Sequence, residues 1–230
     1  MARKTLIFTI TTGRSGTVFL THLLARNLAD ARVYHERTDF MTFGIDTPDA
    51  SDLMQFNNAG VTRKVREFWR RKFQRVLDEP GSVYAEASHF LAKAGLVDNL
   101  DLLPGDVAVK LVHLTREPDK IALSFYNLGV CEDLDRTWLF TLDPRWLNVI
   151  IQAKPFARFG TMGWPLWYVM EMRARAAYYR ELVRDDPRVT FLETSAREAS
   201  DPDGARPFLD AIQPERESGI AIPERQNATE

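Results

Sequence analysis

The loop Gly13-Arg14-Ser15-Gly16-Thr17 brings together residue types that can hold an anion. Glycines allow backbone conformations that are closed to other residues, so such a loop can wrap closely around a ligand. An arginine offers a planar fork of charged donors, and serine and threonine add hydroxyl groups. The composition of this loop therefore predicts a site for a phosphate-like group.

The segments on either side of the loop would point it at a ligand. Residues 5–10 are rich in threonine, isoleucine and phenylalanine, which favours a half-buried strand. From Thr17 onward, apolar residues recur at helical spacing. A helix that begins directly after a glycine-containing loop turns its free N–H groups toward that loop. A plain turn between strand and helix is the alternative interpretation, because short glycine motifs match by accident.

A second pair of anion-binding side chains stands in the middle of the chain. Residues 107–114 form the clearest predicted strand, which leads to Arg116. A helix that contains Ser124 is expected from residue 119 to about residue 128. A guanidinium at the end of a strand and a hydroxyl on the next helix can converge on a dianion. The alternative is a surface arginine and a helical serine that share no ligand.

Both segments resemble the sulfotransferases that use 3′-phosphoadenosine 5′-phosphosulfate (PAPS). The loop at residues 13–17 resembles the 5′-phosphosulfate loop of that family. Residues 110–126 resemble its 3′-phosphate-binding segment, in which an arginine ends a strand and a serine follows, as Arg116 and Ser124 do. The motifs cover about residues 1–130. The C-terminal Arg-Lys-Gly loop of the cytosolic members is not found in the sequence, which leaves the adenine contacts unassigned.

The resemblance implies a role for each of these residues. PAPS would be the co-substrate, and 3′-phosphoadenosine 5′-phosphate (PAP) the product. Arg14 would meet the negative charge that grows on the bridging oxygen as the nucleotide leaves. No metal is expected, because the histidines are scattered without ligand spacing. The residues expected to bind the nucleotide are Gly13, Arg14, Ser15, Gly16 and Thr17 at the 5′ end, and Arg116 and Ser124 at the 3′-phosphate.

Sulfuryl transfer also needs a base within hydrogen-bond reach of the acceptor hydroxyl. Residues 32–34 are expected to form the second strand, and His35 and Glu36 lie at the edge of an open α/β sheet where ligands bind. In the family, the base is a glutamate or a histidine after the second or third strand. Glu36 matches the position of the catalytic glutamate in the carbohydrate-acting members. It is therefore the expected base, with His35 as the second candidate.

The assignment of the base leaves alternatives open. Neighbouring side chains on an extended strand end point to opposite sides, so only one of His35 and Glu36 would face the site. Glu86 and His89, near the end of an expected third strand at residues 82–86, are reserve candidates. The alternative for Glu36 is a solvated carboxylate that pairs with a neighbouring arginine.

Strands alternate with helices along the chain, which predicts a single-domain α/β protein with a parallel sheet of about five strands covered by helices. This P-loop-like, sulfotransferase-type domain is expected at residues 1–213, and a mobile tail at residues 214–230. Residues 41–60 show no clear period and are predicted to form a loop. The irregular, aromatic residues 129–163 would either line an acceptor pocket or pack on the core.

An amphipathic helix is predicted over residues 61–77. A solvated helix face is the favoured interpretation of its polar side, because charge runs are common. The functional interpretation is a surface for an anionic acceptor or partner. Its aromatic residues lie on the apolar side, which argues against nucleic acid. The basic residues on this helix are Arg63, Lys64, Arg66, Arg70, Arg71, Lys72 and Arg75.

The composition of the chain sets outer limits on its function. The chain has 230 residues, a net charge of −2 and a single cysteine, Cys131. This charge gives no basic field for nucleic acid, and one cysteine permits no internal disulfide. No apolar run approaches the ~20 residues of a membrane helix. We therefore expect a cytoplasmic protein without a membrane span that acts on a small-molecule or carbohydrate acceptor, while its oligomeric state stays open.

Two other functions compete with sulfuryl transfer. A kinase of the P-loop class would need ATP and Mg²⁺. Its Walker A loop has four residues between its two glycines, and a lysine stands directly before the Ser or Thr. Here two residues separate Gly13 from Gly16, and Arg14 carries the charge. The strand before Thr115 also lacks the aspartate that holds Mg²⁺. The other competitor is an inactive sulfotransferase-like module that binds an anionic partner through its basic helix.

Overall fold

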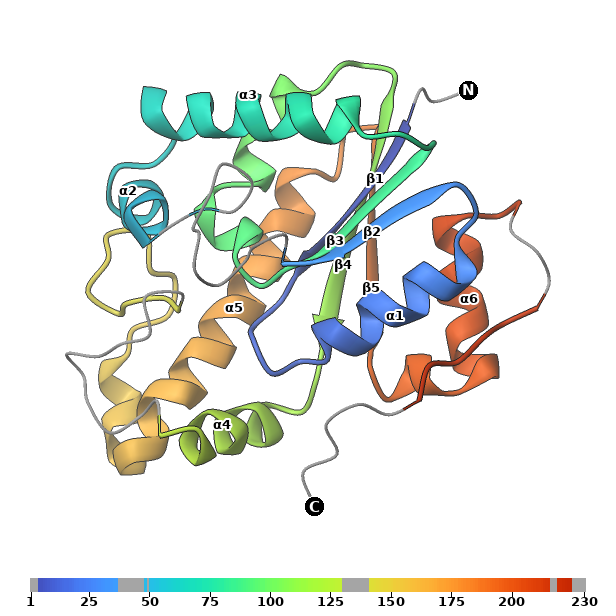
Figure 1. The fold of residues 1–230 in the computed structure, drawn as a ribbon. Coiled ribbons are helices and arrows are strands. Elements are labelled where there is room, and N and C mark those ends of the chain that lie inside the picture. The colour runs from blue at the N-terminus through green and yellow to red at the C-terminus, as the bar shows by residue number, and fades with distance from the viewer. Residues whose placement is uncertain (1–3, 37–47, 49, 130–140, 216–218, 225–230) are drawn as a thin grey trace.

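The strands of the protein form one parallel sheet in the part of the chain that the computed structural model describes, namely residues 4–36, 48, 50–129, 141–215 and 219–224. The order across the sheet is β2-β3-β1-β4-β5, and all neighbours are parallel (Figure 1). This confirms the predicted α/β class and the sheet of about five strands. The strands are β1 (Lys4–Ile10), β2 (Ala31–His35), β3 (Val83–Ala87), β4 (Val107–Thr115) and β5 (Val189–Ser195).

The central strand β1 supplies both cores of the molecule. Leu6, Phe8 and Ile10 belong to one buried cluster, whereas Ile7 belongs to another on the opposite face. This alternation follows from the two-residue period of a strand. Because helices cover both faces, a central parallel strand is largely apolar on both sides, as Leu6, Ile7, Phe8 and Ile10 are.

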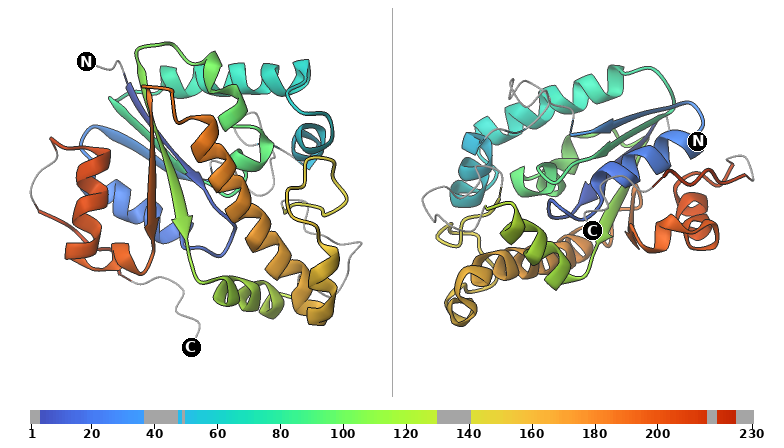
Figure 2. Two further views of the ribbon diagram at one scale, coloured as in Figure 1. Left: turned by 180° about the vertical axis from the view of Figure 1, so that it is seen from behind. Right: turned by 60° about the horizontal axis from the view of Figure 1, so that its bottom comes forward.

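Helices form a layer on each face of the sheet. The helices α1 (Thr17–Asn27) and α6 (Pro202–Ile212) cover one face, and α3 (Arg63–Asp78) and α5 (Gly163–Leu182) cover the other (Figures 1 and 2). Helix α4 (Pro118–Asn127) follows β4 and packs against α5. The described elements also include four short 3₁₀ segments: η1 (Leu91–Ala94), η2 (Val97–Leu102), η4 (Lys154–Met162) and η5 (Glu198–Ser200).

The carboxyl ends of all five strands meet at one edge of the sheet. The register pairs Ile10 with His113, and Thr115 with Ser195, so β1, β4 and β5 end close to one another. His35 of β2 pairs with Ala87 of β3 in the same direction. The segments that carry the candidate site residues therefore all leave the sheet at this edge.

The structure corrects the prediction of a loop over residues 41–60. Residues 41–47 and 49 lie outside the described residues, but Ala50–Ala59 forms a helix, α2. Leu53 and Phe56 are buried, and Asn57 Nδ2 donates to the backbone oxygens of Leu53 and Lys93. Among the described side chains of this helix, Leu53 and Phe56 are the apolar ones that reach the core, and the polar Asn57 completes the buried side. A pattern so short has no recognisable helical period.

The basic helix also differs from its prediction. Helix α3 begins at Arg63, with the Thr62 hydroxyl accepting a hydrogen bond from the Val65 N–H as its N-cap. Lys72 is buried, and its Nζ lies 2.7 Å from Oε2 of Glu86 on β3. Lys72 was predicted among the basic residues of the helix, but it belongs to the core, where its carboxylate partner compensates its charge.

The aromatic region and the C-terminal segment are described only in part. Trp138 and Phe140 of the aromatic region lie outside the described residues. Near the C-terminus, Asn27 exchanges two hydrogen bonds with the backbone of Ala221. The boundary at residue 213 and the mobility of the tail stay predictions. No helix in the described ranges is both long and apolar enough to cross a membrane.

Candidate functional site

The loop after β1 is curled by two residues with left-handed backbone conformations. Arg14 has a φ of 66° and Gly16, the N-cap of α1, a φ of 104°. A Cβ at Gly16 would lie 2.7 Å from the Cβ of Ala196, so this position requires glycine for its conformation and for space. Alternating right- and left-handed residues make backbone concavities that bind anions. The helix N-terminus behind the loop adds its partial positive charge.

Both hydroxyl groups of the loop have hydrogen-bond partners within the protein. The Ser15 hydroxyl is buried, accepts a hydrogen bond from Thr11 at 2.6 Å and donates to the Thr12 carbonyl at 2.8 Å. Thr17 Oγ1 lies 3.0 Å from Nε2 of His35. The Ser15 side chain therefore holds the shape of the loop, and its backbone N–H is the group it can offer to a ligand.

The two predicted phosphate-binding segments meet at the sheet edge. Arg14 Nε donates to Ser124 Oγ at 2.9 Å, and Arg116 Nη1 donates to the Arg14 carbonyl at 2.8 Å. Arg173 of α5, which the sequence did not single out, donates from Nη2 to the Arg116 carbonyl at 3.1 Å. These hydrogen bonds end on uncharged oxygens. Within the described part of the chain, none of the three guanidinium groups has a carboxylate partner.

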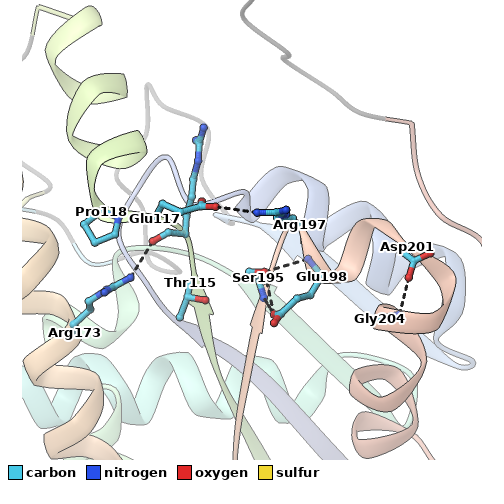
Figure 3. A pocket seen from close by; sticks show the side chains of 10 residues that line it. Thr115, Glu117, Pro118, Arg173, Ser195, Arg197, Glu198, Asp201 and Gly204 are labelled. Carbon is cyan, nitrogen blue, oxygen red and sulfur yellow. Dashed lines mark hydrogen bonds and ion pairs between the residues drawn. The ribbon is translucent and has the colours of Figure 1, made fainter.

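A cavity of about 660 Å³ opens beside these arginines, between the ends of β4 and β5 and the start of α6 (Figure 3). Its carboxylates already have local partners: Glu117 pairs with Arg197 at 3.7 Å, and Glu198 accepts from Ser195 at 3.0 Å. The lining holds three arginines and three carboxylates, and among the described residues Arg116 and Arg173 are the two lining arginines without a carboxylate partner. The cavity is lined by Thr115, Arg116, Glu117, Pro118, Arg173, Ser195, Arg197, Glu198, Asp201 and Gly204.

Glu36 lies directly after β2 and is buried. Its Oε1 is 3.4 Å from Nε2 of His89 and 4.0 Å from Nε2 of His35. Burial raises the pKa of Glu36 to about 7, and the Glu86 charge adds to this, while the His89 amide and Lys93 oppose it. A carboxyl group with a pKa near the operating pH is suited to general base catalysis.

His35 and Glu36 do not point to opposite sides, contrary to the prediction. Both side chains reach the same place because Glu36 lies one residue beyond the end of β2 and has a φ of 40°. The alternation of an extended strand therefore does not apply to it. Thr17 of the loop at residues 13–17 contacts His35 at the same place.

The two reserve candidates for the base, Glu86 and His89, lie in different surroundings. Glu86 is buried inside the sheet layer, where its Oε2 receives hydrogen bonds from Lys72 and Tyr84 at 2.7 Å each. It is a structural group. His89 lies at the site, because a Cβ added at Gly13 would be 3.7 Å from the His89 ring.

Lys93 and Tyr168 lie beside the candidate site residue His89, and the sequence did not reveal this. Lys93 Nζ lies 2.9 Å from Nδ1 of His89 and 2.9 Å from the Tyr168 hydroxyl. Both are fully buried. A lysine in an apolar run, Phe90-Leu-Ala-Lys-Ala94, was the available signal, but it does not tell a buried lysine from one at the surface.

Comparison with known proteins supports the fold. The structure is similar to that of a sulfotransferase from Alicyclobacillus acidocaldarius, with a TM-score of 0.50 and 16% sequence identity over 99% of this chain and 88% of that chain. The fold is sulfotransferase-like. No protein-family model and no curated protein sequence matches this chain significantly. In the described ranges, no group of three or more His, Cys, Asp or Glu residues is arranged to hold a metal ion.

Proposed function

We propose that this protein is a sulfotransferase that moves the sulfuryl group of PAPS to a hydroxyl or amine of a small-molecule or carbohydrate acceptor. The observation that carries the proposal is the contact of Arg14 with Ser124 and Arg116. The resemblance to PAPS-dependent sulfotransferases implies that these residues bind the two phosphorylated ends of one nucleotide. Guanidinium groups without carboxylate partners, beside a cavity of about 660 Å³, fit a nucleotide with several negative charges.

The nucleotide would replace the mutual hydrogen bonds of these residues. Arg116 and Ser124 would bind the 3′-phosphate, while Arg14 and the backbone N–H groups of residues 13–17 would bind the 5′ end. Hydrogen bonds from guanidinium groups to phosphate are shorter and stronger than those to hydroxyl or carbonyl oxygens. The exchange would therefore favour the bound state.

PAPS would supply the sulfuryl group, and the protein would supply charge and a base. The acceptor oxygen forms a bond to sulfur while the bond from sulfur to the 5′-phosphate oxygen breaks. The acceptor proton passes to a carboxylate oxygen of Glu36. Arg14 and the loop N–H groups stabilise the negative charge that develops on the leaving phosphate oxygen. His35 is the second candidate for the base.

A titration with PAP, beside one with ADP and Mg²⁺, tests the donor. A ligand that binds only the folded state raises the melting temperature with its occupancy. We expect a shift with PAP, and its loss in Arg14→Ala and Arg116→Ala. Arg184→Ala is the matched control, since Arg184 follows the far end of α5 and pairs with Glu181. A shift with ADP and Mg²⁺ alone would favour a kinase, and no shift with either would favour an inactive binding module.

A further inference from the structure

Four side chains that can exchange protons lie in a buried row beside the phosphate loop. Glu36 Oε1 is 3.4 Å from His89 Nε2, and His89 Nδ1 is 2.9 Å from Lys93 Nζ. The Lys93 Nζ is also 2.9 Å from the hydroxyl of Tyr168, and a Cβ placed on Gly13 of the loop would lie 3.7 Å from the His89 ring. The row therefore links the candidate base to the loop that would hold the nucleotide.

The surroundings of this row penalise an isolated charge. Lys93 is 0% exposed, and its Nζ lies 5.4 Å from the ring centres of both Phe90 and Tyr168. Burial lowers the pKa values of His89 and Lys93 well below their usual ranges. Among the described residues, the other ionisable groups that act on the row include His35 and Glu86 near Glu36, His22 through His35, and Arg175 near Lys93.

The geometry allows two arrangements of the same number of protons. In the first, Glu36 is ionised, His89 carries its proton on Nε2, and Lys93 is an ammonium group that donates to Nδ1. In the second, Glu36 is protonated and donates to Nε2, while Nδ1 carries the proton and donates to a neutral Lys93. Each arrangement keeps the Lys93–His89 hydrogen bond, the 3.4 Å Glu36–His89 contact and the same total charge. One proton moving across each of these two contacts converts the first into the second.

We propose that Glu36, His89 and Lys93 share one proton, and that Lys93 is the positioning residue that allows Glu36 to be ionised in its buried site. When the proton resides on Lys93, Glu36 is a carboxylate that can take the proton of an acceptor. When it resides on Glu36, the base is blocked. Lys93 acts through His89 and touches no substrate. The sharing itself rests on the geometry, and its catalytic use rests on the proposed function.

The shared proton has a direct spectroscopic signature. Coupled groups lose their protons in steps that belong to the pair. The carboxyl ¹³C signal of Glu36, assigned by its loss in Glu36→Gln, should therefore titrate in two steps with a plateau near neutral pH. Both ring nitrogens of His89 should be partly protonated over that plateau. In Lys93→Met, Glu36 should titrate in one step, about one pH unit or more above the first step of the wild type.

Controls separate proton sharing from packing. Lys110→Met makes the same substitution at a partly exposed lysine of β4 and should leave the two steps unchanged. Tyr168→Phe removes only the hydroxyl at the end of the row and should also keep them. A single-step titration of wild-type Glu36 with His89 in one fixed tautomer would overturn the proposal, even if Lys93→Met fails to fold. If Glu36 titrates in two steps but the protein does not bind PAP, the shared proton is supported and the sulfotransferase function is rejected.

Discussion

The side chain of Arg14 donates a hydrogen bond to that of Ser124 at 2.9 Å, although 110 positions separate the two residues. Arg14 belongs to the loop after β1, and Ser124 to the helix after β4. Strand β4 is the direct neighbour of β1 in the sheet, so the two connections leave it side by side. The same neighbourhood brings the Arg116 guanidinium to the carbonyl of Arg14. A nucleotide bound here would touch both segments at once.

This arrangement predicts that Arg116 and Ser124 distinguish PAP from 5′-AMP. Hydrogen bonds to charged groups contribute about 1.5–3 kcal/mol, so Arg116→Gln should lower the affinity for PAP about 10- to 100-fold. Ser124→Ala removes one neutral donor and should lower it less. The affinity for 5′-AMP, which lacks the 3′-phosphate, should change little in either variant. Isothermal titration calorimetry measures both ligands, and an equal loss for PAP and 5′-AMP would contradict the assignment of the 3′-phosphate site.

The local parts of the site could be predicted from the sequence. The strand, the glycine-containing loop and the helix at residues 4–27 follow from short-range patterns, as do β4, Arg116 and Ser124. In each of these segments the elements are adjacent along the chain, and the residue types of each element indicate its backbone conformation. The parallel sheet follows from the alternation of strands and helices.

The parts that depend on distant contacts could not be predicted. Lys93 meets Tyr168 across 75 positions, and Arg173 meets Arg116 across 57. A lone lysine or arginine gives no signal of its partner. The position of Glu36 depends on a positive φ just beyond β2, which a strand pattern does not show. Helix α2 was missed because too few of its side chains are apolar and buried.

Gly16 is predicted to be essential for the shape of the phosphate loop. Gly16→Ala would place its Cβ 2.7 Å from that of Ala196 and would force a side chain onto a φ of 104°. Strained conformations cost of the order of 1–3 kcal/mol each. Gly60→Ala is the matched control, because Gly60 also has a positive φ, 68°, but has no atom within 4 Å of its added Cβ. In urea unfolding, Gly16→Ala should be the more destabilised variant; equal losses would show that the close packing against Ala196 contributes nothing.

The raised pKa of Glu36 predicts a change in stability with pH. The folded protein holds this proton with a pKa of about 7, against 4.5 for an ordinary glutamate. The resulting stabilisation is complete below pH 4.5 and is lost as the pH rises through 7, because ionisation is then costly in the folded state. The free energy of unfolding of Glu36→Gln, relative to wild type, should therefore be about 2–3 kcal/mol higher at pH 8 than at pH 4.5. Urea titrations at the two pH values measure it, and a difference that does not vary with pH would refute the shift.

Arg173 is predicted to be a third cationic contact for the nucleotide. It lines the cavity beside Arg116, and the hydrogen bond that its guanidinium makes there ends on a backbone carbonyl (Figure 3). A guanidinium that no carboxylate neutralises raises the local potential for an anion. Arg173→Gln should therefore weaken PAP binding about tenfold and flatten its dependence on salt, since surface charges are screened at high ionic strength.

Arg180→Gln provides the matched control for Arg173 on the same helix. Arg180 pairs with Glu193 at 2.8 Å, so its charge is already compensated. It should bind PAP with nearly wild-type affinity at every salt concentration. Calorimetry in low and high salt distinguishes the two variants. If both lose the same affinity, the effect belongs to the net charge of the protein, and Arg173 makes no specific contact. If only Arg173→Gln loses affinity, Arg173 supplies positive charge to the nucleotide site. The Arg-Lys-Gly loop of the cytosolic sulfotransferases is not found in this sequence.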